Sequence, residues 1–280
     1  MLESKLIMYD IKNGFISNRI KILFFILVIC VINIIGVNSI HRSEEMYGVS
    51  ATIMDQMCFV LGGPPYIPKG MFELYTIPLL WLIQNAMIAY IIGYYATNDV
   101  AGYGVQILMR SGDRERWWLS KCVWNGVTVV VLHLWMYIIT AVVAVTGHEK
   151  ISFSLTTKIV TDVCNIGSME GKMYEYAICI FLMPLIVSIT ISALQMTVAL
   201  ITSPIIAFLT VESVMLLSTM FSNRILFPNY GMLSHNMITC GSDINIWEGI
   251  AVCGIIYIVS IVMGLVYFSG MNIIIKERQI

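Results

Sequence analysis

Residues 21–40 read KILFFILVICVINIIGVNSI, a stretch in which Lys21 is the only charged residue. An α-helix needs about 20 predominantly apolar residues to cross the hydrocarbon core of a bilayer. A run of this length and composition is too apolar for the surface of a soluble domain and too long for most buried helices. The stretch therefore predicts a transmembrane helix, and its length and apolar content are the criteria for finding further spans in the chain.

Five later segments meet the same criteria of length and hydropathy. With the first at about 21–40, we expect the others at about 74–96, 119–146, 176–200, 203–221 and 249–275. Composition agrees, because 58% of the residues are hydrophobic, 12% are charged and the mean hydropathy is +0.83. The sequence thus predicts an all-α integral membrane protein with six transmembrane helices in one domain, residues 21–280. Only ITSP, around Pro204, separates the fourth and fifth spans, which predicts a tight hairpin.

The distribution of Lys and Arg predicts the orientation of these spans, because basic residues are retained on the cytoplasmic side. Alternating the loops with the N-terminus inside places ten basic residues in the cytoplasm and six outside. The six occupy a greater length of chain, so their density is roughly threefold lower. We therefore expect a plasma-membrane protein with both termini in the cytoplasm.

The first twenty residues have the pattern of an amphipathic helix. Leu2, Leu6, Ile11, Phe15 and Ile20 recur at helical spacing, and charged and polar residues occupy the other face. The segment lacks the short basic start and the small-residue site that mark a cleavable signal. We expect residues 1–20 to form an interfacial helix whose basic residues face lipid headgroups while its apolar stripe enters the acyl region.

The motifs of self-contained enzymes are missing from the sequence. It has no HExxH, no GxSxG, no GxxxxGK[ST] and no GxGxxG. No Cys or His spacing suggests a metal site, and the net charge of -1 does not favour nucleic acid. We expect a non-catalytic subunit that binds no metal and no cofactor, so any use of ATP would occur on another chain.

The segment between the second and third spans, VQILMRSGDRERWWLSKCVWNG (105–126), is basic and contains a pair of indoles, Trp117 and Trp118. One interpretation is an anchor at the membrane interface, where Trp and Lys are favoured. The order of an apolar run, Arg110, a small residue, further Arg and then Lys121 also resembles the cytoplasmic loop of ATP-binding-cassette permeases of the type 2 exporter class. The resemblance is specific over residues 106–121, and the expected topology extends it to the whole chain.

The resemblance implies the transmembrane subunit of an exporter for a peptide, toxin or amphipathic small molecule. It implies three partners: the lipid bilayer, a second permease subunit that is identical or related, and a separate ATPase subunit that docks under the membrane half and binds ATP and Mg. Docking of the ATPase would fall to a coupling helix between spans two and three. Its residues would be Val105, Gln106, Ile107, Leu108, Met109, Arg110, Ser111, Gly112, Asp113, Arg114, Glu115 and Arg116.

Polar residues in the middle of the spans are the candidates for a translocation path or gate, because such residues are costly in a bilayer. They are Gln84, Asn85, His133, Tyr137 and Glu212. The alternative is that they only form hydrogen bonds between helices. The segment FSNRILFPNYG (221–231) could cap the path as a re-entrant or interfacial element, or be an ordinary loop.

Two further function classes fit the same residues. His133 and Glu212 would suit an ATP-independent ion or solute carrier, which would need an ion gradient and no ATPase. A non-transporting scaffold or sensor subunit would tolerate changes in the polar layer.

Overall fold

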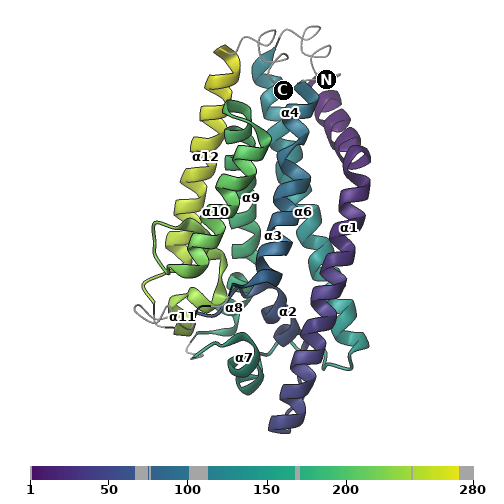
Figure 1. The fold of residues 1–280 in the computed structure, drawn as a ribbon, viewed down its shortest axis with the longest axis vertical. Coiled ribbons are helices and arrows are strands. Elements are labelled where there is room, and N and C mark those ends of the chain that lie inside the picture. Colours follow the sequence, from purple (N-terminus) through teal and green to yellow (C-terminus); the bar gives the residue numbers. More distant parts are fainter. Residues whose placement is uncertain are drawn as a thin grey trace.

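The computed structural model describes residues 2–66, 75, 77–100, 113–167, 171–240 and 242–270, and the regular elements within these ranges are all helices (Figure 1). The longer helices pack side by side, most of the short elements lie at one end of the bundle, and one short helix, Tyr95–Val100, lies at the other. In chain order they are α1 (Leu2–Tyr47), α2 (Ile53–Leu61), α3 (Leu79–Gly93), α4 (Tyr95–Val100), α6 (Arg114–Thr146), α7 (Thr157–Cys164), α8 (Met173–Ala177), the π-helical turn η2 (Ile178–Leu182), α9 (Met183–Ile201), α10 (Pro204–Met220), the 3₁₀ turns η3 (Phe227–Gly231) and η4 (Leu233–His235), α11 (Met237–Cys240) and α12 (Ile246–Gly270).

Five helices of the described residues are long and apolar enough to cross a membrane. They span Lys5–Tyr47, Leu79–Asp99, Arg114–Thr146, Met173–Ile201 and Ile246–Gly270, and the shorter apolar helix Pro204–Met220 lies among them. Their outer faces expose large apolar side chains in continuous stripes, such as Leu23, Phe24, Leu27, Val31 and Ile34 on α1, Leu134, Trp135, Ile138 and Val142 on α6, and Ile255, Ile258, Val262 and Val266 on α12. Exposure of so much contiguous apolar surface to water would be energetically unfavourable, so this is a membrane-embedded helical protein.

The apolar helices alternate in direction, as successive crossings would (Figure 1). The start of α1, the end of α4, the start of α6 and the end of α12 meet at one end of the bundle, here called the N-terminal end. The short elements α2, α7, α8 and α11 lie at the other, here called the opposite end. The hairpin predicted at Pro204 is confirmed, since α9 ends at Ile201, α10 begins at Pro204 and Ser203 caps it through its hydroxyl.

The predicted boundary between an interfacial helix (1–20) and a first span (21–40) does not correspond to a break, because α1 is one helix from Leu2 to Tyr47. At about 1.5 Å per residue it is roughly 70 Å long, more than twice the hydrocarbon thickness. The polar face also differs from the prediction. Asp10 and Asn18 are buried against the bundle, whereas Ile16 and Ile20 are exposed to the lipid side.

Two glycines allow helices to approach closely around α6. A Cβ on Gly14 of α1 would lie 1.9 Å from Nε1 of Trp124, and a Cβ on Gly264 of α12 would lie 2.1 Å from Cζ2 of Trp118. Both tryptophans belong to α6 and are buried. Small residues at helix contacts are typical of membrane proteins, where packing replaces the hydrophobic effect as the force between helices.

At the opposite end, the segments that follow α1 and α6 are joined by backbone hydrogen bonds. The amide of Ile53 donates to the Lys150 carbonyl (3.1 Å), and the Lys150 amide donates to the Ala51 carbonyl (2.9 Å). Beside this junction Glu149 is buried, and neither of its carboxylate oxygens has a hydrogen-bond partner among the described residues. Burial, with the nearby carboxylates of Asp55 and Glu44, raises its pKa to about 8.

Candidate functional site

A buried ionic cluster ties three helices together at the N-terminal end. The ammonium of Lys121 (α6) lies 2.5 Å from a carboxylate oxygen of Asp10 (α1) and 2.6 Å from one of Asp99 (α4). Asp10 also accepts hydrogen bonds from the hydroxyls of Ser120 (2.5 Å) and Tyr95 (3.3 Å). Both carboxylates and the ammonium are buried, so each charge depends on the others for its stability.

Aromatic rings enclose the ammonium of this cluster. It lies 4.9 Å from the ring centroid of Tyr95 and 4.7 Å from that of Trp117. Trp117 stacks on Phe268 of α12, and the indole nitrogen of Trp118 donates to the Ile261 carbonyl (3.0 Å). The interpretation of Trp117, Trp118 and Lys121 as interfacial anchors is therefore wrong, because all three lie inside the bundle.

The predicted coupling helix falls mostly outside the described residues. Val105 to Gly112 lie there, and nothing in the structure bears on them. Asp113 to Arg116 start α6 instead of ending a separate helix. Asp113 caps α6 by accepting from the Arg116 amide (3.1 Å), and Arg114 donates to the carbonyl of Ser269 at the end of α12 (2.8 Å). Arg114 therefore joins α6 to α12, whereas Arg116 forms an ion pair with Asp113 (2.8 Å) at the start of its own helix.

Most of the predicted polar layer comes together in the middle of the bundle. Gln84, Asn85 and His133 line one cavity with Ser188 of α9, and Asn85 and Ser188 line an adjoining cavity with Glu212. The cavities hold about 20 and 10 Å³, which is room for about one water molecule each. The structure thus shows a closed polar layer that contains four of the five predicted residues.

The polar groups of this layer are unevenly satisfied. The Asn85 amide and a ring nitrogen of His133 bond carbonyls of their own helices, at 2.8 and 3.1 Å, and the Gln84 amide donates to the carbonyl of Val60 (3.0 Å). The oxygen Oε1 of Glu212 has no hydrogen-bond partner among the described residues, and the same holds for the side-chain oxygen of Gln84.

Tyr137 is the predicted residue that lies outside the layer. Its hydroxyl donates to the carbonyl of Phe181 in the π-helical turn (2.7 Å), and its ring packs against that of Phe181. A π-helical turn leaves carbonyls without their usual partners along the helix, and here a tyrosine from α6 supplies one. Tyr137 therefore joins α6 to η2 and does not line either cavity.

Sequence reasoning missed the contribution of α9. Ser188, Ser192 and Gln195 line the cavity that holds Glu212, and Ser192 donates to Asn125 of α6 (2.6 Å). The signal was present, because positions 188, 192 and 195 share one helical face. It was overlooked because each residue is small or neutral within an apolar run.

An irregular buried segment, residues 227–236, closes the polar layer towards the opposite end. Its Pro228 and Gly231 line the same cavity as His133. Asn229 holds the segment by donating to the carbonyls of Phe221 (2.8 Å) and Asn223 (3.1 Å), and it also pairs with the His235 ring (2.9 Å). Burial lowers the pKa of His235 to about 4, so the ring is neutral at ordinary pH. The segment is packed into the protein and is not an exposed loop.

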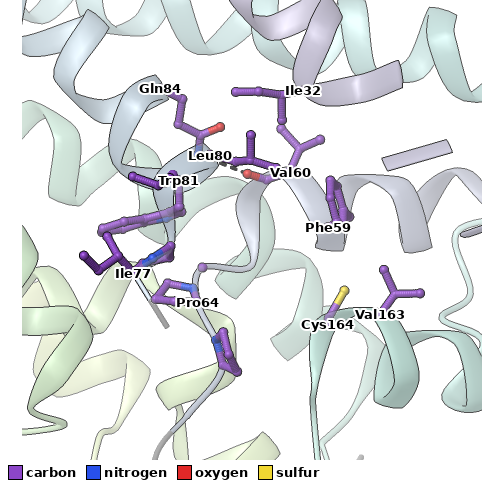
Figure 2. Close-up of a pocket in the computed structure, with 14 residues that line it drawn as sticks. Ile32, Phe59, Val60, Pro64, Ile77, Leu80, Trp81, Gln84, Val163 and Cys164 are labelled. Atoms are coloured by element: carbon purple, nitrogen blue, oxygen red, sulfur yellow. Dashed lines mark hydrogen bonds between the residues drawn. The ribbon is translucent and has the colours of Figure 1, made fainter. Parts of the chain in front are cut away.

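An apolar pocket of about 360 Å³ lies beyond this layer at the opposite end, between α2, α3 and α7 (Figure 2). Trp81 and Gln84 line both this pocket and the polar cavity, so they form the wall between the two. In Figure 2 the Gln84 side chain lies beside Val60, whose carbonyl its amide bonds, and Cys164 lies on another side of the pocket beside Val163. The pocket is large enough for a small apolar group, which the closed polar layer is not.

The arrangement consists of an ionic cluster, a closed polar layer and an outer pocket along one bundle. Among the described residues, no group of three or more His, Cys, Asp or Glu side chains could hold a metal ion. Comparison with protein-family models, with curated proteins and with solved structures gives no match for the chain. Function must therefore be argued from the site alone.

Proposed function

We propose that this chain is the transmembrane subunit of an ATP-binding-cassette exporter, crossing the plasma membrane six times with both termini in the cytoplasm. The observation that carries the proposal is the closed polar layer between helices, capped by residues 227–236 and separated by Trp81 and Gln84 from a pocket at the opposite end. A path that is closed on one side of the membrane is consistent with one state of an alternating-access cycle.

The ionic cluster supports coupling to a separate ATPase. Asp99 and Lys121 flank the segment that contains the proposed docking residues 105–112, and Asp10 binds the same ammonium from α1. A force applied between Asp99 and Lys121 would therefore reach α1 and α6 together. ATP-driven approach of two ATPases would in this way tilt α1, α4 and α6 as a unit and open the polar layer.

A partner permease, identical or related, completes the proposed transporter. The substrate class consistent with a small polar layer beside an apolar pocket is an amphipathic molecule, such as a peptide, toxin or amphipathic small molecule. This chain would supply the path, and the ATPase subunits would bind ATP and Mg.

The test is recovery of an ATPase with the tagged chain, purified in mild detergent from its native membranes. We expect the wild type to bring down a protein with a phosphate-binding loop and measurable ATP hydrolysis, and Arg110→Glu to lose it. Arg224→Glu is the matched control, because it makes the same charge change in an exposed residue at the opposite end. Absence of an ATPase from every sample would refute the proposal, and equal recovery with Arg110→Glu would refute the docking site.

One observation favours a second candidate, a carrier driven by an ion gradient. Glu212 has a carboxylate oxygen without a hydrogen-bond partner among the described residues, beside a cavity of about 10 Å³, which has room for about one water molecule. A carboxyl group in this setting could bind and release a proton during transport. This candidate predicts uptake of protons by vesicles that contain the chain alone, abolished by Glu212→Gln, whereas the exporter proposal predicts none.

A further inference from the structure

A second cavity, of about 380 Å³, lies at the N-terminal end between α1 and the junction of α3 with α4. It is lined by polar and aromatic side chains from residues 13–21 and 94–99. The apolar pocket of Figure 2 differs in being lined mainly by hydrocarbon side chains. A polar cavity at the edge of a membrane bundle needs a polar occupant, because bare polar walls facing lipid are costly.

Lys21 supplies the positive charge of this cavity. Its ammonium lies 4.4 Å from the ring centroid of Tyr90 and 5.5 Å from that of Tyr94. Among the described residues the Lys21 ammonium contacts these two rings and has no carboxylate or hydrogen-bond acceptor, although an ammonium can donate three hydrogen bonds. The two rings hold the charge in place and leave its donors for a ligand.

Asp99 supplies negative charge at the other side of the cavity. It shares Lys121 with Asp10, so the ionic cluster contains two carboxylates and one ammonium. The cluster therefore has one negative charge in excess when both acids are ionised. A ligand with an ammonium group near Asp99 would neutralise this charge.

The position of Lys21 along α1 indicates where such a ligand comes from. The apolar run 22–40 begins immediately after it, and Leu23 and Phe24 are exposed on the lipid side. Arg19 and Lys12 before it are exposed. Lys21 therefore lies at the boundary between the acyl chains and the headgroups, at the depth of lipid phosphates.

We propose that this cavity binds the headgroup of a phosphatidylethanolamine, with the phosphate on Lys21 and the primary ammonium towards Asp99. The two charges of the cavity and those of the lipid lie in the same order across the membrane. Lys21 lies closer to the bilayer centre than Asp99, and the phosphate of a lipid lies closer to the bilayer centre than its amine. Ethanolamine is favoured over choline because its N–H groups can donate to Asp99. An anionic headgroup without an amine would leave the surplus carboxylate uncompensated. This inference does not depend on the exporter proposal.

The experiment is native mass spectrometry of the full chain in detergent, titrated separately with phosphatidylethanolamine, phosphatidylcholine and phosphatidylglycerol. We expect the first phosphatidylethanolamine to bind about tenfold more tightly than either other lipid. Lys21→Met should weaken it about tenfold to a hundredfold, as loss of charge-assisted hydrogen bonds does, and Lys21→Arg should restore it. Arg19→Met is the matched control, because it removes an exposed charge on the same helix at the same depth, and should change binding less than threefold.

Several outcomes would overturn the inference. Equal loss with Lys21→Met and Arg19→Met would mean general attraction of lipid to basic residues. Tighter binding of phosphatidylglycerol than of phosphatidylethanolamine would mean an anionic-lipid site. Displacement of the lipid by millimolar inorganic phosphate would mean a site for the free anion. Thermal unfolding of each variant, unchanged from the wild type, shows that loss of binding is not loss of fold.

Discussion

Replacing Lys121 by Met is expected to destabilise the protein severely. The ammonium is buried between Asp10 and Asp99, at 2.5 and 2.6 Å, so its removal leaves two carboxylates close together without a counter-charge. Breaking a buried ion pair by removing one partner typically costs about 3–5 kcal/mol. For a chain of this size that corresponds to an apparent Tm lower by roughly 6–20 °C.

The assay is thermal unfolding in detergent followed by intrinsic tryptophan fluorescence. Lys158→Met serves as the control, because this exposed lysine should change stability by less than about 0.5 kcal/mol. The triple variant Asp10→Asn, Asp99→Asn, Lys121→Met should recover most of the lost stability, since it leaves no buried charge. The reasoning is refuted if Lys121→Met unfolds like Lys158→Met, or if the triple variant is no more stable than Lys121→Met alone.

Two further predictions concern stability at other places. The raised pKa of Glu149, about 8 against an ordinary value near 4.5, means that the folded protein holds a proton that the unfolded chain releases between these pH values. The contribution of Glu149 to stability should therefore be fully present below about pH 4.5, fall by up to about 1.4 kcal/mol per pH unit as pH rises to about 8, and then level off. Glu149→Gln should flatten the profile of apparent Tm between pH 5 and 8, and an unchanged slope would contradict this origin. Gly264→Ala should cost about 1–3 kcal/mol by forcing α12 away from Trp118, whereas Gly254→Ala on the same helix, which has open space around it, should be neutral or slightly stabilising; equal effects of the two variants in thermal unfolding would contradict the packing described at Gly264.

The apolar runs predicted the helices well because length and hydropathy are local properties of the chain. The helices at 79–99, 114–146, 173–201, 204–220 and 246–270 each lie within a few residues of a predicted span. The hairpin at Pro204 was predictable because proline and a capping serine act within one turn. Boundaries were less certain where helix continues beyond the apolar run, as in α1 and α6.

The face of α1 that points into the bundle could not be predicted, because it depends on a residue 111 positions away in the sequence. Asp10 belongs to a polar face that the sequence alone assigns to headgroups, whereas in the structure Lys121, Ser120 and Tyr95 hold its carboxylate inside the bundle. Trp117 and Trp118 were misread for the same reason, since their partners Phe268 and Ile261 lie on α12. The polar layer was mostly found because an isolated Gln, Asn, His or Glu within a span is conspicuous, whereas the serines of α9 are not.

Access to the polar layer during the ATPase cycle is the most direct measurement of the central claim. Ser188 lines both mid-bundle cavities, so Ser188→Cys, in a chain whose seven native cysteines are replaced, reports on their opening. The purified complex in sealed proteoliposomes would be labelled with a membrane-impermeant maleimide, with and without ATP and vanadate. We expect trapping with ATP and vanadate to change the labelling rate severalfold. A labelling rate that is unchanged by ATP and vanadate but changes with a pH gradient would contradict the exporter proposal and favour the carrier.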